Sequence, residues 1–262
     1  MRIIDLHVHA FADSLAPAAI PALEAAGELT ARYDGTVGGL LAAMDRTGVE
    51  ISVVQPVATK PGQVAAINDW AASIASDRII AFGAMHPDLP DPGVEMARMR
   101  SLGLRGFKMH PEHQSCAPHD PRMEPIYSSA IEQGMIAFFH AGADVIHPTV
   151  LGTPDSFERV LEAWPDLTMV LAHLGGFREW QGVSERLAGR DVWLDTAYTP
   201  GHLPADEFVA IVRAHGADRV LFGSDGPWTD AAEEIALLRE IGLTAEELEG
   251  VLGGNAERLL GL

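Results

Sequence analysis

The stretch Arg2-Ile3-Ile4-Asp5-Leu6-His7-Val8-His9 gives the first indication of both the fold and the chemistry. An apolar run that passes into alternating polar residues predicts a strand, so Asp5, His7 and His9 are expected to project from one face of it. Two imidazoles at a strand end can reach one divalent ion, with Asp5 supporting that site or filling the layer beneath it. The motif alone equally fits a half-exposed strand that ends in two histidines, so further ligands must lie elsewhere.

The composition predicts one large domain. The chain has 262 residues, 47% hydrophobic content and 26 glycines, which suits the length of an α/β barrel, and we expect a single domain over residues 1–262. The formal net charge of -19 provides no basic surface for a phosphate backbone, so no nucleic-acid partner is expected. A small-molecule substrate is expected instead.

The sequence also gives expectations about location. Cys116 is the single cysteine, which excludes an internal disulfide and fits a reducing compartment. The apolar residues near the N-terminus are interrupted by Asp5, His7 and His9, unlike a signal peptide. No apolar stretch approaches membrane-spanning length, so no membrane partner is expected. We therefore expect a cytoplasmic protein, and a homo-oligomer such as a dimer is left open.

Short apolar runs alternate with stretches of helical periodicity, a pattern typical of parallel strands joined by helices. The predicted strands cover residues 3–9, 51–56, 79–84, 104–109, 135–140, 168–173, 192–195 and 220–223. The predicted helices cover residues 37–46, 63–76, 94–102, 125–133, 156–164, 177–188, 205–215 and 231–241. Eight such units predict a slightly distorted (β/α)8 TIM barrel. An open doubly wound sheet is the alternative, but no glycine-rich dinucleotide fingerprint follows any strand.

Two extra C-terminal helices are expected after the eighth unit. The first covers residues 244–252, with Thr244 as N-cap and Glu247 three residues later, and the second covers residues 255–260. Both are expected to pack outside the barrel.

Polar side chains gather where the predicted strands end, and in a parallel barrel this rim carries the active site. The rim residues are His7, His9, His86, Lys108, His110, His140, His173, Ser224 and Asp225. Scattered surface histidines would not follow strand ends in this way. The pattern strengthens the metal-site interpretation of the first strand.

Six motifs in order along the chain carry a resemblance to a known family. They are DLHVH (5–9), GFKMHP (106–111), FFHAG (138–142), LAHLGG (171–176), LFGSDGPW (221–228) and NAERLL (255–260). Together they resemble the amidohydrolase superfamily, and more closely its aminocarboxymuconate-semialdehyde decarboxylase-like, or amidohydrolase 2, branch. The resemblance implies a metal-dependent TIM-barrel enzyme.

The resemblance also implies a role for each matching residue. His7, His9, His140 and Asp225 match the ligands of one divalent ion, and His173 matches a histidine beside the metal-bound water. Three imidazoles and a carboxylate suit zinc, which makes hydroxide available near neutral pH. Asp225 would take the proton of the water, while His173 orients the nucleophile or donates to the developing oxyanion.

Lys108 leaves the number of ions open, because a lysine at this position is carboxylated in binuclear members of the superfamily. Its GFKMHP context resembles the mononuclear branch, so one ion is expected, and a second only if Lys108 is carboxylated. Otherwise Lys108 forms an ion pair or hydrogen bond inside the barrel mouth.

Four residues at or beside the rim are candidates for contact with the substrate: Lys108, His110, His86 and Trp228. His86 and His110 each precede a proline, so ending a strand is the alternative role for both. Of the remaining histidines, four are expected on loop or helix surfaces: His113, His147, His202 and His215.

Two reaction classes fit the same ligands. The first is hydrolysis of a small-molecule amide, ester or lactone by a metal-activated water. The second is nonoxidative decarboxylation of a small unsaturated or aromatic carboxylic acid, which needs a clamp for the carboxylate. Neither Arg105 nor Arg178 is clearly aimed at the metal, so hydrolysis is favoured.

Two further functions fit part of this sequence. A Tat-linked type of metal-dependent deoxyribonuclease also begins with HxH, but its usual strand-four glutamate is absent here and the acidity opposes DNA binding. A noncatalytic metal-bound scaffold is the last alternative, and it predicts metal content without turnover.

Overall fold

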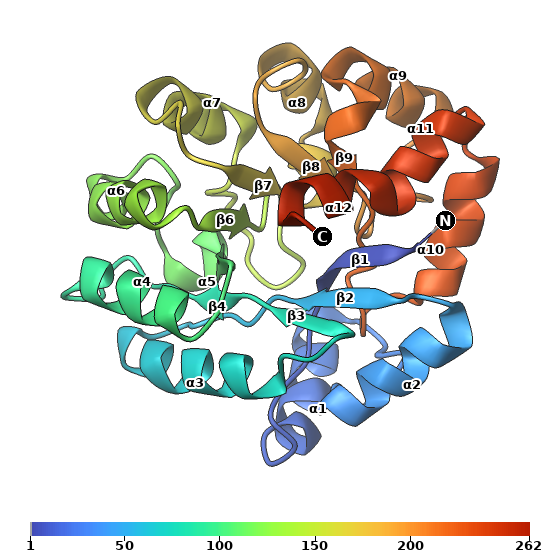
Figure 1. The fold of residues 1–262 in the computed structure, drawn as a ribbon. Helices are drawn as coiled ribbons and strands as arrows, with labels where there is room; N and C mark the ends of the chain where they lie inside the picture. The colour runs from blue at the N-terminus through green and yellow to red at the C-terminus, as the bar shows by residue number, and fades with distance from the viewer. Residues whose placement is uncertain (1) are drawn as a thin grey trace.

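Parallel strands alternate with helices in the computed structural model, which describes residues 2–262 (Figure 1). The strands are β1 (Ile4–Val8), β2 (Ile51–Val54), β3 (Ile79–Ala81), β4 (Gly83–Ala84), β5 (Gly106–Met109), β6 (Ile136–Phe139), β7 (Met169–Leu171), β8 (Trp193–Asp195) and β9 (Val220–Leu221). They form two parallel sheets in the orders β1-β2-β3 and β4-β5-β6-β7-β8-β9. All the predicted strands are present, and the predicted strand 79–84 is divided at Phe82 into β3 and β4.

Backbone hydrogen bonds join the two sheets into one barrel. The Phe82 amide donates to the Val54 carbonyl at 3.0 Å, and the Leu6 amide donates to the Phe222 carbonyl at 2.8 Å. The second bond brings the last strand back to the first. The molecule is therefore the predicted TIM barrel, with a distortion at the third strand position.

Helices surround the strands (Figure 1). They are α1 (Ala16–Gly27), α2 (Val37–Thr47), α3 (Val64–Ile74), α4 (Pro92–Ser101), α5 (Pro111–Gln114), α6 (Glu124–Gln133), α7 (Pro154–Ala163), α8 (Trp180–Arg186), α9 (Ala205–His215), α10 (Ala231–Glu240), α11 (Ala245–Glu249) and α12 (Asn255–Leu260). Short turns of other helix types lie at η1 (Pro61–Gln63), η2 (Pro121–Met123), η3 (His173–Gly175), η4 (Ala217–Arg219) and η5 (Gly250–Gly254). No helix within residues 2–262 combines the length and apolarity that crossing a membrane requires.

The helix predictions were accurate where caps and periodicity coincide. Thr244 caps α11 and forms the predicted reciprocal bonds with Glu247. Helix α8 starts later than predicted because the backbone at Arg178 is left-handed. Helices α1 and α5 were not predicted.

The last helix closes the N-terminal end of the barrel instead of packing outside it as expected. Ala256 and Leu260 of α12 join the buried side chains of the barrel interior, including Leu6 and Phe138. The Arg105 guanidinium donates to the Leu260 carbonyl at 2.6 Å. This end of the barrel is thus filled by apolar packing, which leaves the opposite, C-terminal end for chemistry.

Candidate metal centre

A bulge in β1 aims its two histidines at the barrel mouth. Asp5 pairs with Ser52 and Val8 pairs with Val54, so β1 carries one more residue than β2 between these pairs. The extra residue interrupts the alternation of side chains. His7 therefore lies in the interior with His9, whereas Asp5 does not.

Asp5 instead faces a small cavity beside α2, which is also lined by Leu40 and Met44. The expectation that Asp5 shares a face with His7 and His9 is therefore wrong, and the bulge is the reason. Its carboxylate accepts hydrogen bonds from the Ser224 amide at 2.9 Å and the Ser224 hydroxyl at 2.6 Å. Asp5 thus fixes the residue that precedes Asp225.

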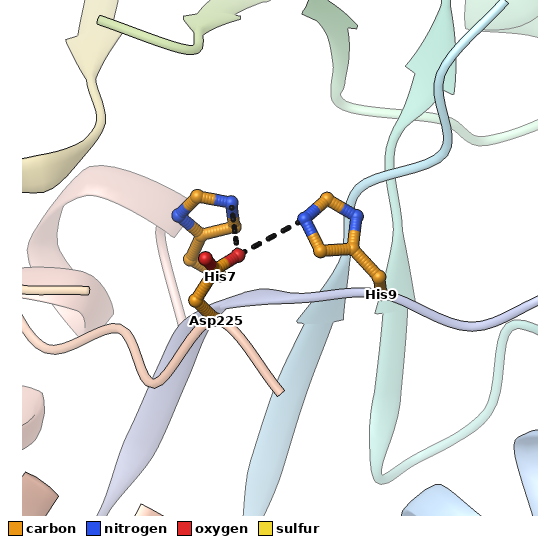
Figure 2. Close-up of side chains that lie close together, drawn as sticks. All are labelled: His7, His9 and Asp225. Carbon is orange, nitrogen blue, oxygen red and sulfur yellow. Dashed lines mark hydrogen bonds and ion pairs between the residues drawn. The ribbon is translucent and has the colours of Figure 1, made fainter. Parts of the chain in front are cut away.

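His7, His9 and Asp225 converge at the barrel mouth, and we call these three residues the inner cluster (Figure 2). Asp225 Oδ1 lies 3.3 Å from His7 Nε2 and 3.1 Å from His9 Nε2. The Asp225 amide donates to the His7 carbonyl at 2.8 Å, and the backbone of Asp225 is left-handed with φ of 65°. Such a conformation is uncommon outside glycine and often occurs at functional sites.

The Nδ1 atoms of His7 and His9 already have hydrogen-bond partners outside the inner cluster. His7 Nδ1 lies 2.9 Å from Asp195 Oδ2, and His9 Nδ1 lies 2.8 Å from the Gln55 carbonyl oxygen. A carbonyl oxygen only accepts, so Nδ1 of His9 carries the proton and Nε2 presents a lone pair. A carboxylate behind His7 has the same effect and is typical of metal-binding histidines.

The charge states in the inner cluster also fit a cation. Burial lowers the pKa of His7 well below its ordinary value, and nearby Lys108 lowers it further. Burial alone would raise the pKa of Asp225, but its close contact with His9 Nε2 and the neighbouring His173 bring the pKa below the ordinary value. Neutral imidazoles and an ionised carboxylate are the forms that bind a divalent ion. The donor set therefore fits the expected metal.

His173 lies beside the inner cluster at the end of β7. Its Nδ1 lies 2.8 Å from the Ala197 carbonyl oxygen, and its Nε2 lies 3.1 Å from His140 Nδ1. The bond to Ala197 places the proton on Nδ1 and leaves Nε2 as an acceptor in the neutral ring. The Asp195 carboxylate also accepts from the His173 amide at 2.8 Å, so one carboxylate positions both His7 and His173.

His140 lies next to His173 and not within the inner cluster. Its ring stacks on His110 with centroids 4.2 Å apart, and its ligand atoms group with His110 and Asp144 among the described residues. Burial lowers the pKa of His140 well below the ordinary value, so its ring is neutral. Its role as a metal ligand stays a prediction.

Lys108 is buried on β5 beneath the inner cluster. Its Nζ lies 3.1 Å from His7 Nε2 and 4.3 Å from the centre of the Phe138 ring. Burial lowers the pKa of Lys108 to about 8. The structure thus places Lys108 in a hydrogen bond inside the barrel mouth, one of the two predicted arrangements.

A cavity of about 670 Å³ opens above these residues. The three predicted substrate contacts Lys108, His110 and Trp228 line it. His86 is not in the lining: it is buried, and its Nδ1 accepts from the Asp88 amide at 3.1 Å. This hydrogen bond belongs to the turn after β4, so the structure supports the strand-ending role of His86.

A second group of polar side chains lies on the loops above the cavity: His113, Asp144 and His147, which we call the outer cluster. His113 and His147 lie on a short helix and a loop and are partly exposed, as expected, but they also contact each other, because His147 Nε2 lies 2.9 Å from His113 Nδ1. All three residues lie in segments that follow the ends of β5 and β6. Their position after two neighbouring strands is the one sequence signal that could have linked them.

A comparison with protein families matches the amidohydrolase model over residues 4–262. No curated protein matches the chain. The matching range includes every strand of the barrel and every residue of the inner cluster.

Solved structures of similar fold cover almost the whole chain. A 2,6-dihydroxybenzoate decarboxylase has a TM-score of 0.77 and 16% identity, with all of both chains covered. A 5-carboxyvanillate decarboxylase from Novosphingobium aromaticivorans, complexed with manganese, has a TM-score of 0.73 and 15% identity, covering 100% of this chain and 96% of that one. A Pseudomonas putida protein provisionally named 2-pyrone-4,6-dicarboxylic acid hydrolase has a TM-score of 0.70 and 20% identity, covering 99% and 97%. At these identities the similarity establishes the barrel fold.

Proposed function

Because the chain belongs to the amidohydrolase family, we propose that residues 1–262 form a single catalytic domain that hydrolyses an amide, ester or lactone bond in a small molecule. The protein is an enzyme of a metal-dependent family. What we propose is which bond it cleaves and which metal it uses. The inner cluster and the cavity above it support both.

We propose that His7, His9 and Asp225 hold one zinc ion, with His140 as a further ligand. Two imidazole nitrogens and a carboxylate oxygen converge here, and hydrogen bonds at Nδ1 orient both imidazoles. This geometry supports the assignment. When bound, such an ion polarises a substrate carbonyl and makes water more acidic. Manganese is the alternative ion, as in the decarboxylase complex.

Asp225 and His173 are the proposed catalytic residues. Asp225 takes a proton from the attacking water and delivers it to the leaving group as the new carbon–oxygen bond replaces the cleaved one. His173 accepts a hydrogen bond from that water through Nε2, since its Nδ1 proton is held by the Ala197 carbonyl. This arrangement favours orienting the nucleophile over donating to the oxyanion.

The composition of the cavity wall favours hydrolysis over decarboxylation. No arginine among residues 2–262 lines the cavity, and Lys108 is the lining lysine, buried against His7. Apolar side chains such as Leu23, Ile67 and Trp70 form the outer wall. A neutral ester, lactone or amide with an apolar group suits this surface better than a carboxylate does.

Arg105 and Arg178, considered as carboxylate clamps, lie outside the lining. Arg105 is engaged with the Leu260 carbonyl at the opposite end of the barrel, and the Arg178 guanidinium stacks over Phe177. A decarboxylase remains the second candidate, because several enzymes of similar structure are decarboxylases and Lys108 offers a cation at the cavity floor. For that reaction Lys108 would have to receive the carboxylate.

Labelled water separates the two reactions. The zinc- or manganese-loaded protein is assayed against a panel of apolar esters, lactones and amides and of phenolic carboxylic acids. In ¹⁸O water, hydrolysis places one ¹⁸O in the product acid, whereas decarboxylation in deuterated water places deuterium on the carbon that lost carbon dioxide. Carbon dioxide release without ¹⁸O-labelled product acid would overturn the hydrolase proposal.

A further inference from the structure

The outer cluster joins two loops at the entrance of the cavity. His113 lies within the short helix α5 that follows β5, and Asp144 and His147 lie in the segment that follows β6. One ligand atom from each of the three residues lies within 4.8 Å of the others. All three residues are partly exposed, so an ion from solvent can reach them.

Backbone amides bind only one of the two carboxylate oxygens of Asp144. Its Oδ1 accepts hydrogen bonds from the Ile146 amide at 2.9 Å and the His147 amide at 2.7 Å. Its Oδ2 accepts neither of these bonds and lies 3.7 Å from His110 Nε2, which is longer than a hydrogen bond.

The two imidazoles of the outer cluster face each other through nitrogen atoms. His113 Nδ1 and His147 Nε2 are 2.9 Å apart, and the rings are nearly perpendicular at 87°. Two nitrogens directed at one point can share a proton or can ligate one cation. The carboxylate oxygen beside them adds a negative donor, which favours the cation.

We propose that His113, Asp144 and His147 form a second divalent-metal site, separate from the inner cluster, which binds Zn²⁺ or a chemically similar ion. Two imidazoles and one carboxylate are a donor set that zinc accepts, with one position left open. His113 and Asp144 line the cavity, so the open position faces the same space as the inner cluster. An ion there would meet a polar group of the substrate at the cavity entrance.

His110 and His140 also group with Asp144, but their geometry fits one ion less well. The two rings are stacked at an interplanar angle of 6°, so their in-plane lone pairs run parallel instead of converging. Both side chains are buried. The His110 ring therefore lies between His140, a proposed ligand of the inner ion, and His113 of the outer cluster.

Zinc stoichiometry tests this proposal directly. Purified protein is saturated with Zn²⁺, desalted and analysed by mass spectrometry for metal per chain, and isothermal titration gives the affinity of each site. Wild type is expected to bind two ions, and His147→Gln and Asp144→Asn are each expected to bind one. His7→Ala is expected to keep the outer ion. His202→Ala removes an exposed histidine outside both clusters and serves as the matched control, with two ions expected.

The outcomes distinguish this site from the proposed catalytic site. A wild-type protein that binds one ion, retained in His147→Gln and lost in His7→Ala, would overturn the second site and keep the first. One ion lost in His147→Gln and retained in His7→Ala would do the reverse. Circular dichroism shows whether each variant is folded, and Asp144→Asn preserves the shape and the acceptor oxygen of the side chain. Full zinc content in both folded variants would also overturn the outer site.

Discussion

The inner and outer clusters both contain two histidines and one aspartate, yet they are built in different ways. The imidazoles of the inner cluster project from the end of β1, and the Nδ1 atom of each is held by an oxygen from β8 or from the residue that follows β2. The outer cluster lies on loop segments, where its aspartate is held by local backbone amides. Strand register fixes donor positions more precisely than loops do. Similar donor sets can therefore differ in rigidity, and so in the chemistry that they support.

The largest difference is expected when one histidine is removed from each cluster. His7→Ala should lose the inner metal and the activity together, because the remaining donors cannot hold the ion. His147→Gln should retain most of the activity, since it leaves every contact of the inner cluster intact. Both variants are compared by kcat/KM and by metal content. Equal losses of activity would remove the functional distinction between the clusters.

Substitution of His173 tests whether activity requires more than the metal of the inner cluster. His173→Ala should lower kcat by about 10²- to 10⁴-fold, the range for a positioned proton-transfer or water-orienting group, while the metal content stays unchanged. Single-turnover kinetics with the metal-loaded variant measure the loss. A fully active, metal-loaded His173→Ala protein would eliminate the catalytic role.

Substitution of Asp195 tests whether its hydrogen bond with His7 strengthens metal binding. Asp195→Asn should weaken metal binding at the inner site by about 10- to 100-fold, as is typical when the partner of a metal-binding histidine is changed. The amide keeps an oxygen for the His173 and Ala197 amides but no longer carries the charge that orients His7. Asp144→Asn is the matched control and should leave the inner affinity unchanged. An unaltered affinity in Asp195→Asn would show that strand geometry alone orients His7.

The sequence predicted those features that depend on periodicity. The barrel, the paired histidines of β1 and the position of Asp225 all follow from residues placed at strand ends. The bulge in β1 could not be predicted, because it depends on pairing with β2 and not on the residues of β1 alone. The orientation of Asp5 was wrong for this reason.

The outer cluster was missed for a related reason. Its members are far apart in the sequence and lie in segments without a repeating pattern, so only the packing of two loops brings them together. The role of His86 depended in the same way on the turn after β4, where its ring bonds to the Asp88 amide. Neither contact leaves a trace in local propensity.

The smallest effect is expected at the apolar outer wall of the cavity. Trp70→Ala removes an aromatic side chain from the cavity lining without touching either set of donors. The KM for an ester with a large apolar group should rise by about tenfold, which corresponds to about 1.4 kcal/mol of lost apolar contact, while kcat stays unchanged. A small acetyl ester, which would not reach the wall, serves as the control substrate. A fall in kcat for both esters would mean that Trp70 maintains the geometry of the inner cluster, and the wall could then no longer be treated as a separate binding surface.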